Sequence, residues 1–214
     1  MNYIASVAMG GQSRGAPTAK RAAVQAAVLE ATAALLAEGV SYADLNIERI
    51  TTRAGISRTA FYFYFRDKRE LLLRLTEDVT DELYREGDIW FSGVGDPSEE
   101  VGEALTNMGS LYHEHGAVLR AIVQAASLDD EVAVFWHAVV DRFVVATARR
   151  ITELQQSGEA ADGLDARATA FALCWMVERS FNQQLVLGEP IARPDLVDAL
   201  AAIFVRALYA PRVA

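Results

Sequence analysis

The stretch AGISRTAFYFYF, residues 54–65, holds the side chains of this sequence that are best suited to contact nucleic acid. Ser57 is of a type that caps helices, because its hydroxyl accepts a hydrogen bond from a free amide in the first helical turn. A cap at Ser57 places Arg58 and Thr59 at the exposed start of the next helix. That is the end of a recognition helix that faces base edges, where arginine can bind guanine and threonine offers a hydroxyl and a methyl.

The aromatic residues that follow have the spacing of a helix. Phe61 and Phe65 lie four residues apart and share one face, where both rings can pack against a preceding helix. Tyr62 lies off that face, with a phenol that can reach a phosphate, whereas the position of Tyr64 is ambiguous. Gly55 suits a tight turn between two helices, because glycine accepts a positive φ. The alternative is a buried strand, since alternating aromatics also favour sheets, but apolar residues at helical spacing extend on both sides.

Together these features resemble the N-terminal DNA-binding module of the TetR family of transcriptional regulators. The resemblance covers roughly the first third of the chain. Its pattern consists of an apolar helix from Ala22 to Leu36, a second helix opened by Leu45-Asn46-Ile47 with Ile50 and Ala54 inside it, the AGIS turn, and FYFYF followed by Lys68. Positions 59 and 60 vary among members of the family, so they do not indicate which operator is bound.

The resemblance implies a role for each polar residue of this module. Arg58 and Thr59 would contact base edges. Phosphates would be held by five residues: Asn46, Ser57, Tyr62, Tyr64 and Lys68. Asn46 would also cap the second helix and so direct the positive end of its dipole at the DNA backbone. The implied partner is a palindromic double-stranded DNA operator, bound by a homodimer whose recognition helices enter successive major grooves.

Charge is distributed unevenly along the chain. The 214 residues carry a net charge of −9, yet the first 74 residues hold ten Lys and Arg against six Asp and Glu. An acidic protein binds DNA poorly as a whole, so affinity is expected from a localised basic face and from two copies acting together. The hydrophobic content of 52% is ample for a sizeable core.

Three observations indicate in which cellular compartment the protein is expected. The single cysteine, Cys174, excludes an intrachain disulfide and agrees with a reducing cytoplasm. No apolar run reaches the roughly 18 residues of a membrane span, so no membrane partner is expected. Residues 1–19 lack the basic start and the continuous apolar stretch of a signal peptide, and we interpret them as a flexible arm. Arg14, Lys20 and Arg21 would let this arm touch DNA, and the alternative is a solvated tail.

The whole pattern predicts an all-α fold of about nine helices. A helix-turn-helix DNA-binding domain at 20–66 precedes a larger C-terminal ligand-binding and dimerisation domain at 67–214. Beyond the first domain, apolar periodicity and turn residues predict helices at about 67–90, 98–115, 117–126, 130–156, 165–187 and 195–209. The TetR resemblance implies the same number of helices.

Three stripes of mostly apolar residues mark the C-terminal domain. Each recurs at spacings of three or four: Leu105, Met108 and Tyr112; Trp136, Val140, Phe143 and Thr147; and Cys174, Val177 and Phe181. Facing one another, the stripes would enclose an aromatic volume. Periodicity alone favours a filled core, whereas the family resemblance implies a pocket for a small-molecule effector.

Within the family, VLRAIVQAASLDDEVAVFW and MVERSFNQQLVLGEP are most similar to the repressors of ethionamide activation in mycobacteria. That resemblance implies a long apolar channel for an elongated lipophilic effector. Cys174 and Val177 stand where a polar side chain would give an amide-bearing ligand a hydrogen bond. Their apolarity leaves Thr147 and Asn182 as the donors.

The last two helices are expected to form the dimer interface. Their apolar residues exceed what packing onto one domain needs, and a two-fold four-helix bundle would cover the surplus. The surplus consists of Phe171, Trp175, Leu185, Ile203, Phe204 and Leu208. The alternative is that Trp175 and Phe204 complete the core of the monomer.

Residues that could support catalysis are poorly arranged. His113 and His115 are two residues apart and lie on different sides of a helix, which disfavours a shared metal. Cys174 lies in an apolar helix with no base nearby in sequence, and no glycine loop is suited to phosphate. Glu178 and Arg179 are expected to form a structural ion pair or a cap in the pocket floor. We therefore expect no catalytic residue, metal or cofactor.

The sequence thus supports a cytoplasmic, homodimeric repressor that a lipophilic small molecule releases from its operator. One alternative is a regulator of the same fold that activates transcription or responds to a protein partner, and a filled C-terminal core would favour it. The other is a helical carrier or enzyme with a vestigial DNA-binding module, which would not bind its own promoter selectively.

Overall fold

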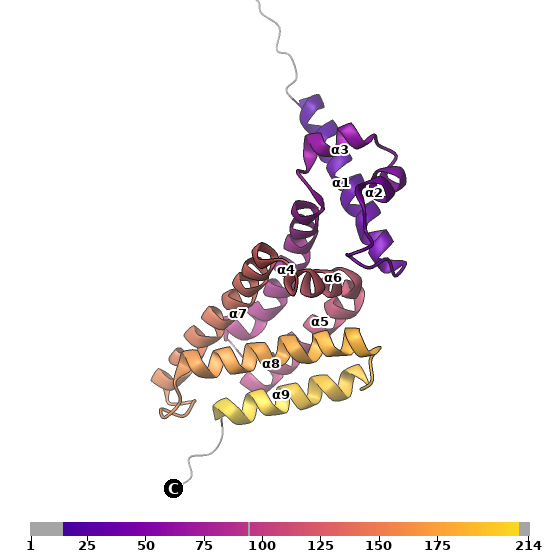
Figure 1. Cartoon of the computed structure of the whole chain (residues 1–214). Coiled ribbons are helices and arrows are strands. Elements are labelled where there is room, and N and C mark those ends of the chain that lie inside the picture. Colours follow the sequence, from indigo (N-terminus) through magenta and orange to yellow (C-terminus); the bar gives the residue numbers. More distant parts are fainter. Residues whose placement is uncertain (1–14, 94, 210–214) are drawn as a thin grey trace, which may run out of the picture.

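The computed structural model describes residues 15–93 and 95–209, and these form nine α-helices without a strand. The all-α prediction is therefore confirmed. The helices are α1 (Gly15–Ala37), α2 (Ile47–Ala54), α3 (Arg58–Tyr64), α4 (Lys68–Ser92), α5 (Pro97–Glu114), α6 (Gly116–Ala126), α7 (Asp130–Ser157), α8 (Ala166–Leu187) and α9 (Arg193–Tyr209) (Figure 1).

The predicted arm is shorter than expected. Helix α1 begins at Gly15, so residues 15–19 belong to a helix and not to an arm. The alanine-rich sequence continues the helix backwards, and the proline near its start is tolerated because the first turn needs no amide donor there. Lys20 and Arg21 are exposed on α1. The rest of the predicted arm, with Arg14, lies outside the described residues.

A small three-helix module occupies one end of the molecule (Figure 1). Its core consists of side chains that are at most 6% exposed: Val28, Leu35 and Leu36 of α1, Leu45, Ile50 of α2, and Phe61 and Phe65 around α3. The rings of Phe61 and Phe65 lie 5.6 Å apart, which confirms that they share the buried face. The strand alternative for FYFYF is wrong, because residues 58–64 are helical.

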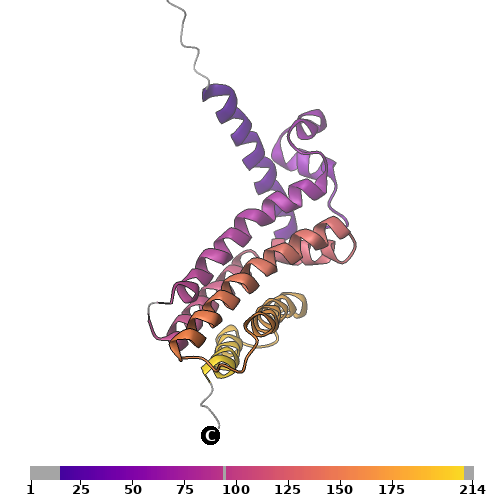
Figure 2. The same cartoon turned by 90° about the vertical axis from the view of Figure 1, so that its left-hand side faces the viewer.

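Helix α4 runs from this module into the larger bundle (Figure 2). It contacts α5, α6 and α7, and its buried residues follow the spacing of one helical face from Leu71 to Phe91. Asp67 caps its start by accepting a hydrogen bond of 2.8 Å from the Glu70 amide. One continuous helix therefore belongs both to the three-helix module and to the bundle.

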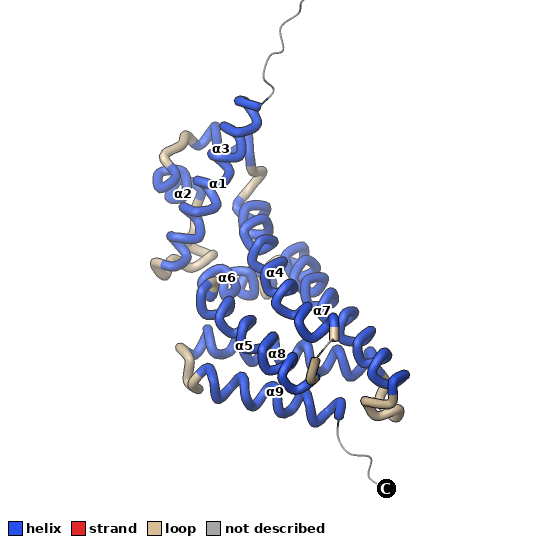
Figure 3. Tube along the Cα trace, turned by 180° about the vertical axis from the view of Figure 1, so that it is seen from behind, coloured by secondary structure: helices blue, strands red, loops and turns tan. Residues whose placement is uncertain are grey.

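Helices α8 and α9 form an outer layer of the bundle, where they lie side by side (Figure 3). Helix α8 packs against α7, and α9 packs against α5. Two prolines that were expected in loops lie at helix starts instead. Pro97 opens α5 behind the Asp96 cap, and Pro194 is the second residue of α9. Both are positions where a helix needs no amide donor.

The predicted apolar surplus of the last two helices is smaller than expected. Phe204 and Leu208 are 6% and 0% exposed, so these two residues complete the core of the monomer. The Phe204 ring meets the Trp90 ring edge to face at 5.0 Å. Phe171 is 57% exposed and Ile203 48% exposed, so these two apolar side chains are left uncovered by the monomer.

Trp175 and Leu185 are half-buried. Val186 of α8 is a further exposed apolar residue, at 54%. So is Leu187, at 64%. We refer to the exposed apolar side chains of these two helices, Phe171, Val186, Leu187 and Ile203, as the α8/α9 patch.

Candidate DNA-binding surface and ligand cavity

Two side-chain caps hold the helix-turn-helix. Asn46 accepts a hydrogen bond of 2.9 Å from the Arg49 amide at the start of α2. Ser57 accepts one of 3.1 Å from the Ala60 amide at the start of α3. Between them Gly55 ends α2 with a φ of 67°, in the left-handed region that favours glycine. The predicted capping roles of Asn46 and Ser57 are confirmed, and both residues are exposed at a positive helix end.

The outer face of α3 carries polar and aromatic side chains. Arg58 is its first residue, and both Arg58 and Thr59 are exposed. The Arg58 guanidinium carbon lies 5.7 Å from the centre of the Tyr62 ring, and its Nη2 lies 3.4 Å from the Tyr62 hydroxyl. Tyr62 is 47% exposed. These three side chains thus form one surface that can reach a groove.

Phe63 adds an aromatic ring that the sequence interpretation did not single out. It is 72% exposed, although Phe61 and Phe65, two residues away on either side, are buried. Two residues after Phe61, it points about 200° around the helix from the buried face, so the helical spacing contained the signal. Tyr64 is half-buried, with the Arg21 guanidinium carbon 6.0 Å from its ring centre.

The ammonium of Lys68, a predicted phosphate contact, makes several contacts within the protein. Its Nζ donates towards the carbonyl oxygens of Tyr42, Ala43 and Leu45, at 3.1, 3.4 and 3.2 Å. It also lies 4.6 Å from the centre of the Tyr42 ring. An ammonium has three donors, and three carbonyls face it. The geometry therefore favours a structural link between the first turn of α4 and the loop before α2.

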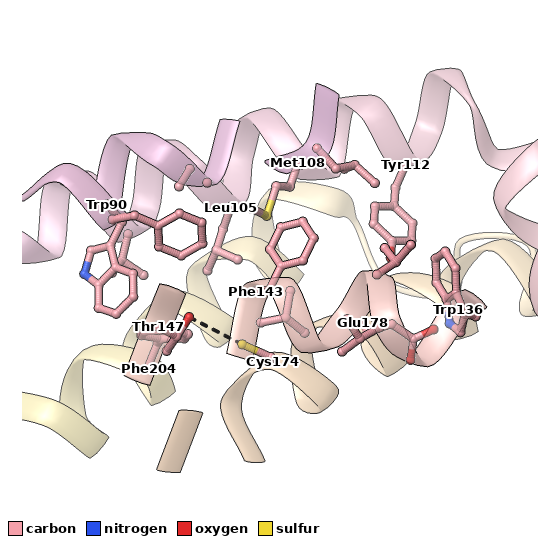
Figure 4. Close-up of a pocket in the computed structure, with 18 residues that line it drawn as sticks. Trp90, Leu105, Met108, Tyr112, Trp136, Phe143, Thr147, Cys174, Glu178 and Phe204 are labelled. Carbon is pink, nitrogen blue, oxygen red and sulfur yellow. Dashed lines mark hydrogen bonds between the residues drawn. The ribbon is translucent and has the colours of Figure 1, made fainter. Parts of the chain in front are cut away.

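An apolar cavity lies inside the bundle (Figure 4). Its free volume is about 90 Å³. That is several times the roughly 10–15 Å³ that one water molecule needs. The core of the C-terminal domain is therefore not completely filled. The lining comprises Leu83, Gly87, Trp90, Phe91, Val101, Ala104, Leu105, Met108, Tyr112, Trp136, Val139, Val140, Phe143, Thr147, Cys174, Val177, Glu178 and Phe204.

Nine of the ten predicted pocket residues line this cavity, so the three stripes do face one another. Phe181 does not. Its ring stacks on the Tyr112 ring, with 5.0 Å between the ring centres, and lies next to Gly109. The sequence interpretation missed the contribution of α4, which comprises Leu83, Gly87, Trp90 and Phe91. These residues form a helical stripe of their own, within the segment that the sequence predicted only as a helix at about 67–90.

Polar groups are sparse in the cavity wall. Thr147 and Cys174 face each other, with 3.4 Å between the hydroxyl oxygen and the sulfur. Burial raises the pKa of the Cys174 thiol to about 11, against a smaller opposite effect of Thr147, so this thiol stays protonated at neutral pH. Asn182, which was expected to serve as a donor, is buried outside the cavity lining.

Glu178 is the ionisable carboxyl group of the cavity wall, and it is 6% exposed. Its predicted ion pair is loose, because 3.9 Å separate the Arg179 Nε from the Glu178 Oε2 and the Arg179 side chain is 58% exposed. Burial raises the pKa of Glu178, while Arg179 and Trp136 lower it by less. Burial, and then the charge of Glu178, raise the pKa of the neighbouring Tyr112.

An ion-pair cluster connects the two functional regions. Arg69, in the first turn of α4, lies 3.3 Å from the Asp129 carboxylate and 3.1 Å from that of Glu131. Asp129 also caps α7 by accepting hydrogen bonds from the Glu131 and Val132 amides. The start of α7, about two turns before Trp136 in the cavity wall, is thus held against the end of α4 that adjoins the DNA-binding module.

Among residues 15–93 and 95–209, no group of three or more His, Cys, Asp or Glu side chains is arranged to hold a metal ion. Within the same residues, no helix has the length and apolarity needed to span a membrane.

Two family descriptions match separate parts of the chain. "Bacterial regulatory proteins, tetR family" matches residues 28–75, and "Transcriptional regulator EthR, C-terminal domain" matches residues 101–210. Among individual proteins, the HTH-type transcriptional regulator EthR of Mycolicibacterium smegmatis is 31% identical over 191 residues, which is 86% of each chain. EthR of Mycobacterium tuberculosis is 30% identical over 186 residues, 84% of each chain.

Solved structures show the same fold at lower sequence identity. NalD, the secondary repressor of the MexAB-OprM multidrug efflux pump in Pseudomonas aeruginosa, superposes with a TM-score of 0.74 at 18% identity, over 90% of this chain and 98% of that one. The regulator FadR of Bacillus subtilis, in complex with stearoyl-CoA, gives 0.71 at 17% identity, over 85% and 97%. The chain therefore belongs to the TetR family of bacterial transcriptional regulators, and within that family it is homologous to the EthR proteins.

Proposed function

We propose that this regulator is a cytoplasmic homodimeric repressor that binds a palindromic operator and is released by a lipophilic small molecule in the cavity. The observation that carries the proposal is the course of α4. Its first turn adjoins the three-helix module, and its last turns supply Trp90 and Phe91 to the cavity wall. A ligand that displaces these side chains therefore acts on the helix that positions the DNA-binding surface.

On the DNA side, Arg58 and Thr59 are the proposed base contacts. The exposed ring of Phe63 is a further candidate, since an aromatic ring can contact a thymine methyl group. Asn46, Ser57, Tyr62 and Tyr64 are the proposed phosphate contacts, the first two at positive helix ends. Lys68 is left out of this set, because carbonyl oxygens surround its ammonium.

The cavity needs to widen to hold an elongated ligand. Its free volume of about 90 Å³ accommodates only part of such a molecule. Phe143 is half-buried, and its ring lies in the middle of the cavity between the two ends (Figure 4). A ligand that moves Phe143 also moves Tyr84 and Phe91 of α4, because their ring centres lie 5.3 and 6.3 Å from it. Binding would then favour a second position of α4, and the operator would favour the first.

Dimerisation would use the α8/α9 patch. An exposed apolar surface on two adjacent helices suits a two-fold four-helix bundle, in which each copy covers the other's patch. Two copies would present two recognition helices to successive major grooves, which is what a palindromic site requires. We also propose that the division between the DNA-binding and ligand-binding domains lies at residues 66 and 67, directly before α4.

Binding of the purified protein to the DNA upstream of its own gene tests the DNA-binding part. Arg58→Ala should reduce binding to that DNA by about tenfold or more and relax base preference. The matched control is Arg74→Ala, which removes an arginine from the exposed face of α4 and should leave binding unchanged. An equal loss of binding by Arg58→Ala to specific and random DNA would contradict a base contact.

A cavity-filling variant tests the ligand-release part. Val177→Phe places a large ring in the cavity wall, so the variant should bind DNA normally but no longer respond to lipophilic compounds that release the wild type. Its matched control is Val134→Phe on the exposed face of α7, which should respond as the wild type does. A Val177→Phe variant that still responds would place the effector elsewhere, and a wild type that no lipophilic compound releases would favour a protein partner.

A further inference from the structure

The cavity contains a carboxylate whose hydrogen-bonding capacity is largely unused. Glu178 is 6% exposed, it lines the cavity, and neither of its carboxylate oxygens has a hydrogen-bond partner among the described residues. Most buried polar groups have a partner, and a buried charge is unfavourable unless it is paired. An ordinary apolar core would not retain such a group, so the position of Glu178 calls for a functional explanation.

Arg179 does not provide the missing partner. The Arg179 guanidinium approaches no closer than 3.9 Å, forms no hydrogen bond with Glu178, and is 58% exposed to solvent. The labelled side chains beside Glu178 at this end of the cavity are those of Trp136, whose hydrogen bonding lowers the pKa of Glu178, and Tyr112 (Figure 4). Neither is a cation, so the positive charge that Glu178 lacks is not supplied from within the wall.

We propose that Glu178 binds a positively charged group of the effector, so that the ligand class is a lipophilic cation such as a long-chain or arylalkyl amine. This assignment rests on the proposed effector role of the cavity and adds the charge of the ligand. An ammonium would donate hydrogen bonds to the two free carboxylate oxygens, and hydrogen bonds between charged groups are stronger than neutral ones. The rings of Trp136 and Tyr112 would add attraction between the cation and their π faces.

The arrangement of the wall also orients such a ligand. Glu178, Trp136 and Tyr112 lie at one end of the cavity, and Trp90 and Phe204 lie at the other (Figure 4). Between the two ends the wall is almost entirely apolar, with Leu105, Met108 and Phe143 among its residues. A molecule with one terminal ammonium and an apolar tail would therefore place its head at Glu178 and extend its tail towards Trp90.

Burial also explains why a cation would be preferred over a neutral ligand. The carboxylate is already removed from water in the free protein, so a cation loses only its own hydration on binding. Ionised Glu178 is then stabilised by the same contact that holds the ligand. The competing possibility is a carboxyl that stays protonated and donates a hydrogen bond to a neutral oxygen of the ligand; it predicts the opposite order of affinities.

Three probes with the same tail separate these possibilities: octylamine, octan-1-ol and octanoate. Binding to the full-length protein is measured at neutral pH by titration calorimetry. Octylamine should bind at least about tenfold more tightly than octan-1-ol, which is the effect of one charge-assisted contact, and octanoate should not bind measurably. Equal or tighter binding of octan-1-ol, or no binding of octylamine, would overturn the proposal.

Glu178→Gln keeps the shape of the side chain and removes its charge. The variant should bind octylamine and octan-1-ol with similar affinity. Glu103→Gln is the matched control, since it makes the same change at an exposed position of α5 outside the cavity lining and should keep the preference for the amine. If Glu178→Gln fails to fold, the order of the three probes on the wild type still decides the question.

Measuring operator binding in the presence of the probes distinguishes a failure of the charge assignment to Glu178 from a failure of the proposed function. Should octan-1-ol or another neutral compound release the operator while octylamine does not, the cavity is an effector site and the charge assignment to Glu178 is wrong. A protein that never binds its upstream DNA selectively would overturn the proposed function itself, whichever probe the cavity prefers.

Discussion

Replacing Lys68 by alanine distinguishes a structural role of this residue from a DNA contact. In the structure its ammonium faces three carbonyl oxygens at 3.1 to 3.4 Å and lies 4.6 Å from the centre of the Tyr42 ring. Hydrogen bonds to a charged group contribute about 1.5–3 kcal/mol, and a contact between a cation and a ring adds about 0.5–1 kcal/mol. Lys68 is half-buried, so solvent reduces the sum, and we expect Lys68→Ala to lower the free energy of unfolding by about 2–3 kcal/mol.

Two measurements test this expectation. For a chain of this length each kcal/mol shifts the unfolding midpoint by about 2–4 °C, so thermal unfolding followed by circular dichroism should show a fall of about 4–12 °C. A lysine that binds a phosphate contributes about 0.9 to the slope of log affinity against log salt concentration. We expect this slope, measured by fluorescence anisotropy with operator DNA, to stay the same in Lys68→Ala.

The control is Lys20→Ala, which removes an exposed ammonium from α1 and should leave the unfolding midpoint unchanged. The reasoning from the structure is refuted if Lys68→Ala unfolds at the wild-type temperature and binds operator DNA with a slope reduced by about one. That result would return Lys68 to the set of phosphate contacts that the sequence indicated.

Three further predictions follow from single contacts. Ser57→Ala removes the cap of α3 and should lower the free energy of unfolding by about 1 kcal/mol in chemical denaturation, whereas Ser57→Asp should keep the cap; equal losses would contradict the capping role. Burial raises the pKa of Glu178, so above about pH 4.5 its carboxyl ionises first in the unfolded state and destabilises the fold. Glu178→Gln should therefore gain stability relative to the wild type as pH rises from about 4.5, and a difference independent of pH would argue against a raised pKa. Phe171→Arg combined with Ile203→Arg should halve the mass measured by light scattering, while Val134→Arg on α7 should not; an unchanged mass in the double variant would exclude the α8/α9 patch as the dimer interface.

Apart from the start of α1, the helices and their approximate boundaries could be predicted from the sequence, because they depend on interactions between residues close together in the chain. Ser57 and Asn46 are helix caps because a short side chain reaches an amide three residues later. Phe61 and Phe65 share a face because a helix repeats every 3.6 residues. Local rules of this kind also brought nine of the ten predicted pocket residues to the cavity wall, since each stripe occupies one face of its helix.

The remaining features depend on which helices meet, and no local pattern specifies that. Lys68 binds carbonyl oxygens that lie 23 to 26 residues earlier in the chain, so only the folded module shows that its donors are used. Phe204 belongs to the monomer core because Trp90 meets it from α4. Glu178 lies next to Arg179 in the sequence, and that proximity suggested an ion pair. In the structure the two charged groups are 3.9 Å apart, so the pair is loose.

Sequence alone thus determined the helices, their caps and the apolar face of each one. Tertiary structure decided which polar groups are satisfied and where a cavity remains. The physical reason is the range of the interactions: a cap or a helical stripe is set within a few residues, whereas burial and pairing of a charge are set by side chains from distant helices. Glu178 points into the cavity while the guanidinium of Arg179 extends to solvent, and only the packing of α8 against its neighbours separates these two adjacent residues.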